Sequence, residues 1–160
     1  RQVNAAESHI KALVKKGVLL KVPDSSRGLK LVEEYSGIPI VGRVAAGSPI
    51  SAVENIEKYI PTNPISSPVD FFLRVKGDSM KDIGIIENDL VGVKKASTAE
   101  NGSVVVARLE DEVTLKRFVQ ENGTIKLVAE NKNYDDILID QNSGFCLEGI
   151  AVGVVREDVF

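Results

Sequence analysis

The chain contains few of the residues on which many enzymes and secreted proteins depend. Among its 160 residues there are one cysteine, one histidine and no tryptophan. The single cysteine, Cys146, excludes an intrachain disulfide and is typical of a reducing compartment, so we expect a cytoplasmic protein. With only one histidine, His9, we expect neither a metal site nor a cofactor. No hydrophobic run approaches the roughly 18 residues that span a membrane, so no membrane partner is expected.

The rest of the composition is that of a folded, globular chain. Hydrophobic residues make up 43% of it and charged residues 27%, which is ordinary for a protein that buries a core. A chain of this length supports one core, or one core with a small additional module. Because the chain begins at Arg1 within a helical pattern, we expect further residues to precede it in the intact protein.

The charge is distributed unevenly along the chain. Residues 1–30 contain seven Lys or Arg and two Asp or Glu, which gives this segment a net charge of +5. The whole chain carries −3, so residues 31–160 carry −8. A basic segment joined to an acidic body favours a protein that contacts nucleic acid at one end only.

The basic segment has the pattern of a helix followed by a hairpin. Residues 4–16 are predicted to form a helix that begins at Asn4, a favourable N-cap, and ends in a lysine-rich turn. Two short β runs, 18–22 and 28–32, enclose a turn-rich segment that contains Arg27. This order is typical of the second half of a winged helix-turn-helix, in which the helix lies in the major groove and the wing contacts phosphate.

From residue 38 onward, short β-rich runs are separated by Gly, Pro, Asn and Asp. Asp111 and the Asn122-Gly123 pair are predicted to form tight hairpin turns. The predicted fold class is therefore α+β, with a partial winged helix domain at 1–34, a linker at 35–40 and a mostly β domain at 41–160. The predicted strands are 38–44, 71–76, 90–95, 103–109, 112–119, 124–128 and 149–155.

Six segments occur in an order and at spacings that make a chance similarity improbable. They are residues 4–13, 26–28, 42–47, 77–85, 104–108 and 149–154. On these segments the chain resembles the LexA repressors of the bacterial SOS response over nearly its whole length. The resemblance implies a dimeric repressor that binds operator DNA through its winged helix, with a LexA/signal-peptidase-like β domain that dimerises and cuts its own chain. It also implies an activated RecA filament on single-stranded DNA as the partner that stimulates cleavage.

Ser79 and Lys116 are the residues we predict to carry out that cleavage. A serine hydroxyl becomes a nucleophile when a neighbouring base takes its proton, and the only histidine, His9, belongs to the N-terminal segment. A lysine can replace histidine if burial lowers its pKa from about 10.4 toward roughly 7 to 8. Strand alternation places Lys116 on the same side as Thr114 and Phe118, where it can lie against an aromatic ring.

The cleavage site implied by the resemblance is the bond between Ala46 and Gly47. Small side chains at this bond suit a narrow cleft, in which the carbonyl must come within about 3 to 3.5 Å of the hydroxyl. The backbone amides of Asp78 and Ser79 are candidate donors to the oxyanion. Each piece alone has a common structural explanation, because Gly-Asp-Ser is usually an ordinary turn and a strand lysine is usually solvated. Their joint spacing, which follows the family pattern, favours the catalytic interpretation.

The resemblance also carries DNA-contacting positions onto the N-terminal segment. The base-reading positions fall on Gln2, Asn4, Ala5, Glu7 and Ser8, whereas Lys11 and Arg27 are better suited to phosphate. Gln2 and Val3 replace the serine and proline of the best-known members, and Ser8 stands where a second glutamate is usual. The set of acceptors for cytosine amino groups is therefore smaller, so the operator sequence is not fixed by the resemblance. The strand around residues 149–155 is a candidate dimer contact.

Three other classes of protein remain open at the level of the sequence. A UmuD-like processed polymerase accessory protein shares the cleavage residues but lacks the helix and wing. A signal peptidase uses the same dyad on other chains and needs a membrane anchor. A DNA-binding repressor with a catalytically inert dimerisation domain predicts that Lys116 is exposed to solvent and ion-paired.

Overall fold

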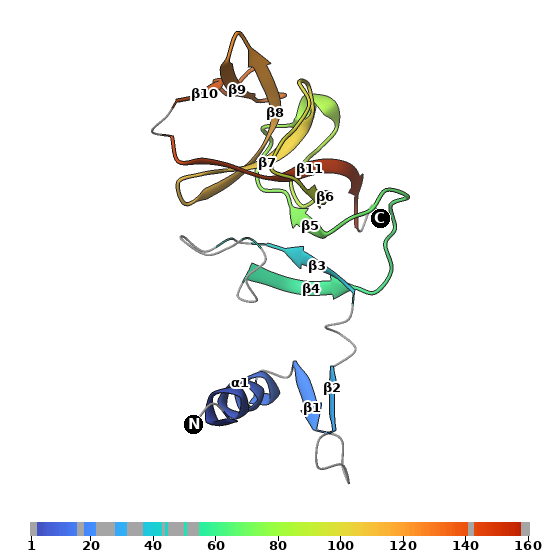
Figure 1. The fold of residues 1–160 in the computed structure, drawn as a ribbon. Coiled ribbons are helices and arrows are strands. Elements are labelled where there is room, and N and C mark those ends of the chain that lie inside the picture. Colours follow the sequence, from blue (N-terminus) through green and yellow to red (C-terminus); the bar gives the residue numbers. More distant parts are fainter. Residues whose placement is uncertain are drawn as a thin grey trace.

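The computed structural model describes residues 3–15, 18–21, 28–31, 37–42, 44, 50, 55–140 and 143–157. They form a helix with a two-stranded sheet and, further along the chain, a sheet of nine strands (Figure 1). No helix in this described part of the chain is long and apolar enough to cross a membrane.

The N-terminal unit consists of helix α1 and one hairpin. Helix α1 covers Val3–Lys15, and strands β1 (Leu19–Lys21) and β2 (Leu29–Leu31) pair in antiparallel fashion. The backbone N–H of Val18 donates to the Leu13 carbonyl at 3.0 Å, which links the last helical turn to β1. The predicted helix and hairpin are thus confirmed, except that α1 begins at Val3, so Asn4 lies inside the helix and is not its N-cap. The described residues do not show a complete winged helix-turn-helix, which stays a prediction.

The larger unit is a single β-sheet of nine strands, each hydrogen-bonded to its neighbours in the sheet. Its order is β10-β9-β8-β7-β11-β6-β5-β3-β4. The strands are β3 (Ile38–Val41), β4 (Ile56–Ile60), β5 (Phe71–Arg74), β6 (Leu90–Lys95), β7 (Val104–Leu109), β8 (Glu112–Glu121), β9 (Thr124–Val128), β10 (Ile137–Ile139) and β11 (Phe145–Val155). The predicted mostly β domain is therefore confirmed, although β4 and β10 are absent from the predicted set.

Tight turns fix the register of the central strands. The β7–β8 turn lies at Glu110 and Asp111, where Glu110 has a φ of 52°. In the β8–β9 turn Asn122 and Gly123 have φ values of 50° and 81°, as the predicted Asn-Gly hairpin requires. Both predicted turns are therefore confirmed.

One strand pairing differs in direction from the others. Strand β3 is parallel to β5, with Ile40 opposite Phe72 and Val41 opposite Leu73. It is antiparallel to β4 on its other side. Strand β3 is thus held between β4 and β5, and beyond it the chain passes through Gly42 and Val44 alongside the continuation of β5.

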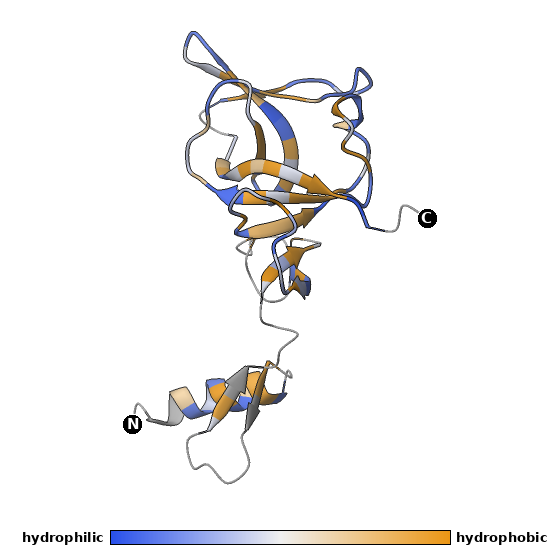
Figure 2. Ribbon diagram, turned by 90° about the vertical axis from the view of Figure 1, so that its right-hand side faces the viewer, coloured by the Kyte–Doolittle hydropathy of each residue, from blue (hydrophilic) through white to orange (hydrophobic). Residues whose placement is uncertain are grey.

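Three hydrophobic clusters form the core of the β unit. Met80 and Ile50, which are 1% and 3% exposed, belong to the first cluster with residues of β5, β6 and β7. Phe118 and Leu127 belong to the second, and Ile40, Phe72 and Leu90 form the third. In Figure 2, much of the strand ribbon of the β unit is coloured as hydrophobic, with hydrophilic stretches on strands and loops.

Candidate active site

Ser79 lies in a turn that directly follows the segment after β5. Gly77 takes a left-handed conformation with a φ of 73°, which lets the chain bend away from the strand direction. Met80, the next residue after Ser79, is 1% exposed and fixes the turn to the first hydrophobic cluster. A short 3-10 helix, Lys81–Ile83, comes next and ends at Gly84. The Ser79 side chain is therefore half-buried on a bend whose two sides are held in place.

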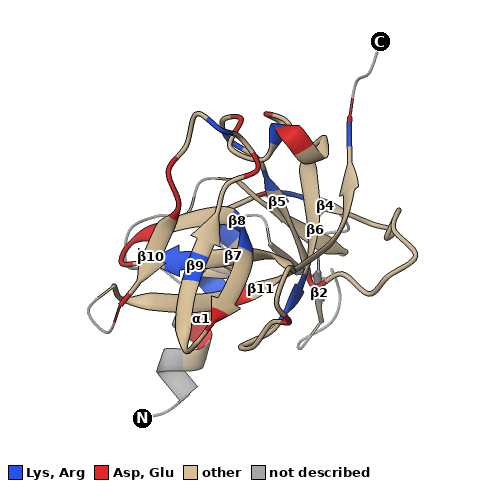
Figure 3. Cartoon of the chain, turned by 90° about the horizontal axis from the view of Figure 1, so that it is seen from above, with Lys and Arg blue, Asp and Glu red and all other residues tan. Residues whose placement is uncertain are grey.

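Lys116 lies on β8 with its amine directed at this bend. The Lys116 side chain is buried, at 6% exposure, and the residue is opposite Val105 of β7. Its Nζ lies 3.0 Å from Ser79 Oγ, 2.8 Å from Thr114 Oγ1 and 3.0 Å from the Leu115 carbonyl oxygen. Basic residues of β8 and β9 can be located in Figure 3. The structure thus brings Ser79 and Lys116, which are 37 residues apart, into hydrogen-bond contact.

The surroundings of the Lys116 amine favour its neutral form. Burial lowers the pKa of Lys116 below its ordinary value of 10.5. Among the described residues, no carboxylate forms an ion pair with this amine. A neutral amine donates two hydrogen bonds and accepts one. It can donate to the Leu115 carbonyl and to Thr114 Oγ1 while accepting the proton of the Ser79 hydroxyl.

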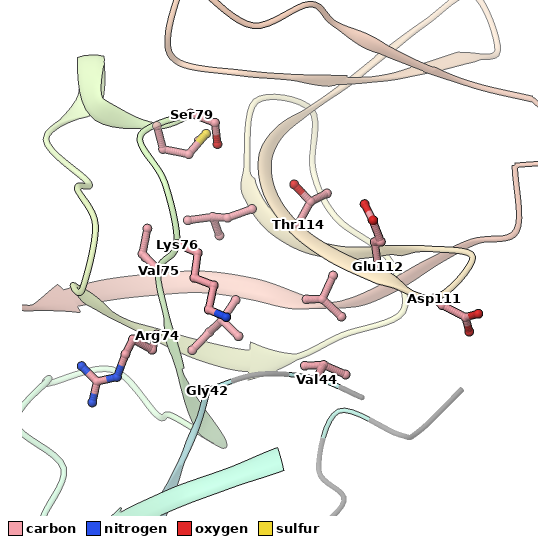
Figure 4. A pocket seen from close by; sticks show the side chains of 13 residues that line it. Gly42, Val44, Arg74, Val75, Lys76, Ser79, Asp111, Glu112 and Thr114 are labelled. Atoms are coloured by element: carbon pink, nitrogen blue, oxygen red, sulfur yellow. The ribbon is translucent and has the colours of Figure 1, made fainter. Parts of the chain in front are cut away.

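A cleft of about 370 Å³ lies beside Ser79. One wall is formed by residues 111–115, at the start of β8, and another by residues 73–76, at the end of β5. Gly42 and Val44, which come after β3, line the side of the cleft away from Ser79 (Figure 4). The cleft therefore contains the predicted nucleophile at one end and the chain that leads to residues 46 and 47 at the other.

Comparison with known proteins identifies the family. Residues 39–152 match the peptidase S24-like family model. The chain is 50% identical to the LexA repressor of Shewanella woodyi over 163 residues, which cover 98% of this chain and 80% of that protein. It is 48% identical to the LexA repressors of a Marinomonas species and of Photorhabdus laumondii, with 96% and 98% of this chain and 80% and 79% of those proteins covered. The chain belongs to the LexA repressor family. It is a self-cleaving serine peptidase.

Several positions that the LexA resemblance implies lie outside the described residues. They include the Ala46–Gly47 bond, Gln2 and Arg27. Other positions are on α1, where Asn4 and Ala5 are helical and Glu7, Ser8 and Lys11 are exposed. The structure brings these last residues onto one helix, and their contacts with DNA stay a prediction.

The candidate oxyanion donors of this LexA-family site lie in the Ser79 turn. Among the backbone hydrogen bonds of the described residues, none has the Ser79 N–H as its donor. The Asp78 carbonyl accepts hydrogen bonds from the Lys81 N–H at 3.2 Å and from the Asn131 amide at 2.9 Å. The turn is therefore held by its carbonyl, and the role of the two amides as oxyanion donors stays a prediction.

Two residues beside the turn are missed by the sequence analysis. Asn131 and Tyr134 both bind Asp78, the residue before Ser79. In the sequence they lie in a polar stretch without periodicity. Only the fold, which brings them across 53 and 56 residues to Asp78, shows that they belong to the site.

Proposed function

We propose that the chain is a repressor of DNA-damage genes that binds operator DNA as a dimer and inactivates itself by cutting the Ala46–Gly47 bond with a Ser79/Lys116 dyad. The observation that carries the proposal is the 3.0 Å contact between Lys116 Nζ and Ser79 Oγ, made by a buried amine whose pKa is lowered. This burial argues against an inert dimerisation domain, for which an exposed and ion-paired lysine is expected.

The reaction proceeds in two halves. Ser79 Oγ attacks the carbonyl carbon of Ala46 as neutral Lys116 accepts the hydroxyl proton. When the tetrahedral intermediate collapses, the bond to the Gly47 nitrogen breaks and Lys116 returns the proton to the departing amine. Water then attacks the Ser79 ester with Lys116 again acting as the base. The bond between the Ala46 carbonyl carbon and Ser79 Oγ breaks, Lys116 returns the proton to Ser79 Oγ, and the new Ala46 terminus is released as a carboxylate.

The register of β3 supports the choice of the cleavage site. Both observed pairs of β3 with β5 are offset by 32 residues, since Ile40 is opposite Phe72 and Val41 opposite Leu73. Beyond the strand, the described residues Gly42 and Val44 line the cleft that contains Ser79. Ile50, the next described residue, is buried in the same hydrophobic cluster as Met80.

A substrate on the same chain is present at high effective concentration, so cleavage needs control. Burial lowers the pKa of the Lys116 amine, and we propose that the bond is cut only when the substrate segment pairs in the cleft beside Ser79. We propose that a RecA filament on single-stranded DNA stabilises the paired arrangement and so stimulates cleavage.

The N-terminal unit supports DNA binding by its charge and its order of elements. Helix α1 has Glu7, Ser8 and Lys11 exposed, and residues 1–30 carry a net charge of +5. We propose that α1 enters the major groove and that the β1–β2 hairpin, with Arg27, contacts phosphate as a wing. A dimer on a two-fold symmetric operator follows from the same proposal.

The cleavage proposal is tested by monitoring fragments of the purified chain at increasing pH. The rate should rise with pH until Lys116 is neutral and should not depend on protein concentration, because the reaction is intramolecular. Mass spectrometry should find one fragment that ends at Ala46 and one that begins at Gly47. Ser79→Ala should remain intact under the same conditions. Equal cleavage of the wild type and Ser79→Ala, or a cut elsewhere, would contradict the proposal.

A further inference from the structure

The segment from Glu130 to Tyr134 contacts residues close in sequence to both Ser79 and Lys116. On one side it contacts the turn that carries Ser79. The Asp82 backbone N–H donates to the Glu130 carbonyl at 2.9 Å, and the Tyr134 hydroxyl donates to Asp78 Oδ1 at 2.6 Å. These contacts attach the segment to the residues before and after Ser79.

On its other side the same segment is attached to β8. The Arg117 guanidinium donates from Nε to a carboxylate oxygen of Glu130, with both side chains partly buried. Arg117 is the neighbour of Lys116 in the strand. The segment therefore links a residue adjacent to the base with a residue adjacent to the nucleophile.

Asn131 is the buried centre of this link. It is 2% exposed, and its Nδ2 donates to the Asp78 carbonyl at 2.9 Å and to Asp78 Oδ2 at 3.2 Å. Its Oδ1 accepts the backbone N–H of Asn133 at 3.1 Å, which fixes the orientation of the amide. A buried amide with all of its partners in place has one favourable orientation, and its loss leaves polar atoms of the turn without a partner.

The carboxylate of Asp78 takes part as an acceptor. Its hydrogen bond from Tyr134 and the nearby Lys81 ammonium, at 3.5 Å, lower the pKa of Asp78 below its ordinary value of 3.8. The carboxylate is therefore ionised at neutral pH and accepts both the Asn131 amide and the Tyr134 hydroxyl.

We propose that Asn131 is a positioning residue for self-cleavage: by holding both the carbonyl and the carboxylate of Asp78, it fixes Ser79 Oγ within reach of Lys116 Nζ. The inference rests on the Ser79/Lys116 mechanism proposed above. Asn131 touches neither reacting atom, so it acts through the placement of the turn. A displacement of about 1 Å in a reacting group can slow a reaction by about 100-fold.

The test measures self-cleavage of the whole chain from pH 7 to pH 10 for Asn131→Asp. This variant keeps the size of the side chain and the acceptor for Asn133 but replaces the donor to Asp78 with a like charge. We expect cleavage to be about 10-fold to 100-fold slower even at the high-pH plateau, where Lys116 is neutral in both proteins. The added carboxylate favours charged Lys116 and moves the midpoint of the pH profile upward, which the plateau rate does not depend on. Asn133→Asp is the matched control, since Asn133 is exposed, and should cleave at the wild-type rate.

A second substitution separates positioning from a merely structural role. Asp78→Asn combined with Asn131→Asp reverses the donor and the acceptor, and this double variant should recover part of the rate lost in Asn131→Asp. A wild-type rate in folded Asn131→Asp, a shift of its pH midpoint instead of its rate, or no recovery in the double variant would overturn the inference.

Two further variants keep the result decisive. If Asn131→Asp does not fold, Tyr134→Phe replaces it, because Tyr134 is 43% exposed and loses only its hydroxyl. We expect this variant to cleave roughly 5-fold more slowly, and a wild-type rate would overturn the inference. Ser79→Ala belongs in the same series. If it is cleaved, the dyad itself is wrong, whereas an inert Ser79→Ala beside a fully active Asn131→Asp rejects only the role of Asn131.

Discussion

At the scale of single residues, burial of Lys116 has opposite effects on stability and on chemistry. Removing the amine from water lowers its pKa and so favours the neutral form that can act as a base. The same burial opposes folding wherever the unfolded chain would bind a proton that the folded chain does not. A lysine kept at 6% exposure without an ion-pair partner among the described residues therefore lowers stability in favour of function.

This trade-off predicts a pH dependence of stability that belongs to Lys116. Between its lowered folded pKa and the ordinary value of 10.5, the unfolded state binds more protons, so the free energy of unfolding rises with pH. Lys116→Met removes the titrating group. Urea unfolding should therefore show that the free energy of unfolding of the wild type increases from pH 7 to pH 10. The increase should be smaller in Lys116→Met. Lys126→Met, at an exposed position of β9, is the control and should behave like the wild type. An equal gain in all three proteins would contradict the prediction.

The sequence predicts the two reacting residues but not the residues that hold them. Alternation along β8 and the absence of a histidine outside the N-terminal segment are compatible with Lys116 as the base, and its spacing from Ser79, which follows the LexA family pattern, selects it. Asn131 has no such signal, because a loop asparagine gains its role only from a partner that the fold supplies. The Lys116 amine contacts oxygens of Ser79, Thr114 and Leu115, and the packing of this side chain against Phe118 stays a prediction.

At the scale of elements, β3 is the strand that connects the fold to the proposed reaction. It leads to the segment that we propose is cut, and it is parallel to β5, the strand that leads to the Ser79 turn. Ile40 anchors the strand, since it is fully buried and packs with Phe72 and Leu90. Loosening β3 should therefore affect cleavage even though no reacting atom is changed.

Ile40→Ala tests this connection. Removing a buried isoleucine side chain should lower the free energy of unfolding by about 2 to 4 kcal/mol. It should also slow self-cleavage of the folded protein, because the parallel pairing with β5 is weakened. Leu147→Ala, in the second hydrophobic cluster, is the control. Both variants should lose stability in denaturant unfolding, and only Ile40→Ala should lose cleavage rate below its unfolding transition. Equal cleavage rates in the two variants would count against a role for β3.

The strands that the sequence analysis misses are those with the weakest local signals. Strand β4 contains Glu57 and Lys58, both exposed, and its position is set by pairing with β3. Strand β10 has three residues and lies at the edge of the sheet, next to β9 only. By contrast, the β8–β9 hairpin is predictable because Asn122 and Gly123 adopt the left-handed conformations that their residue types favour.

At the scale of the whole molecule, we assign operator binding to the N-terminal unit and self-cleavage to the β unit, and the two units differ in charge. The basic N-terminal unit is proposed to bind the operator, and the acidic β unit contains the Ser79/Lys116 pair. The contacts among the residues of the dyad and of the Asn131 segment all lie within the β unit. Changes in α1 should therefore leave the cleavage chemistry intact.

Asn4→Ala is expected to separate the two functions. The loss of a base-reading amide should weaken operator binding by about 1 to 3 kcal/mol. Self-cleavage should proceed at the wild-type rate. Binding is measured by titration of an operator duplex at fixed salt concentration, and cleavage by fragment appearance in the same preparation. Glu112 is exposed on β8 of the β unit, so Glu112→Ala is the control and should bind the operator like the wild type. Unchanged affinity of Asn4→Ala would place the base contacts on other residues.

The position of β3 between β4 and β5 also determines the fate of the chain once it is cut. Hydrolysis after Ala46 would leave β3 on the shorter, DNA-binding product and both of its neighbouring strands on the longer one. The two products would then still be held together by the backbone hydrogen bonds that β3 forms with β4 and with β5. Cleavage of the peptide bond and dissociation from the operator would be separate events. The lifetime of the complex between the two cleavage products would determine how soon the regulated genes are expressed.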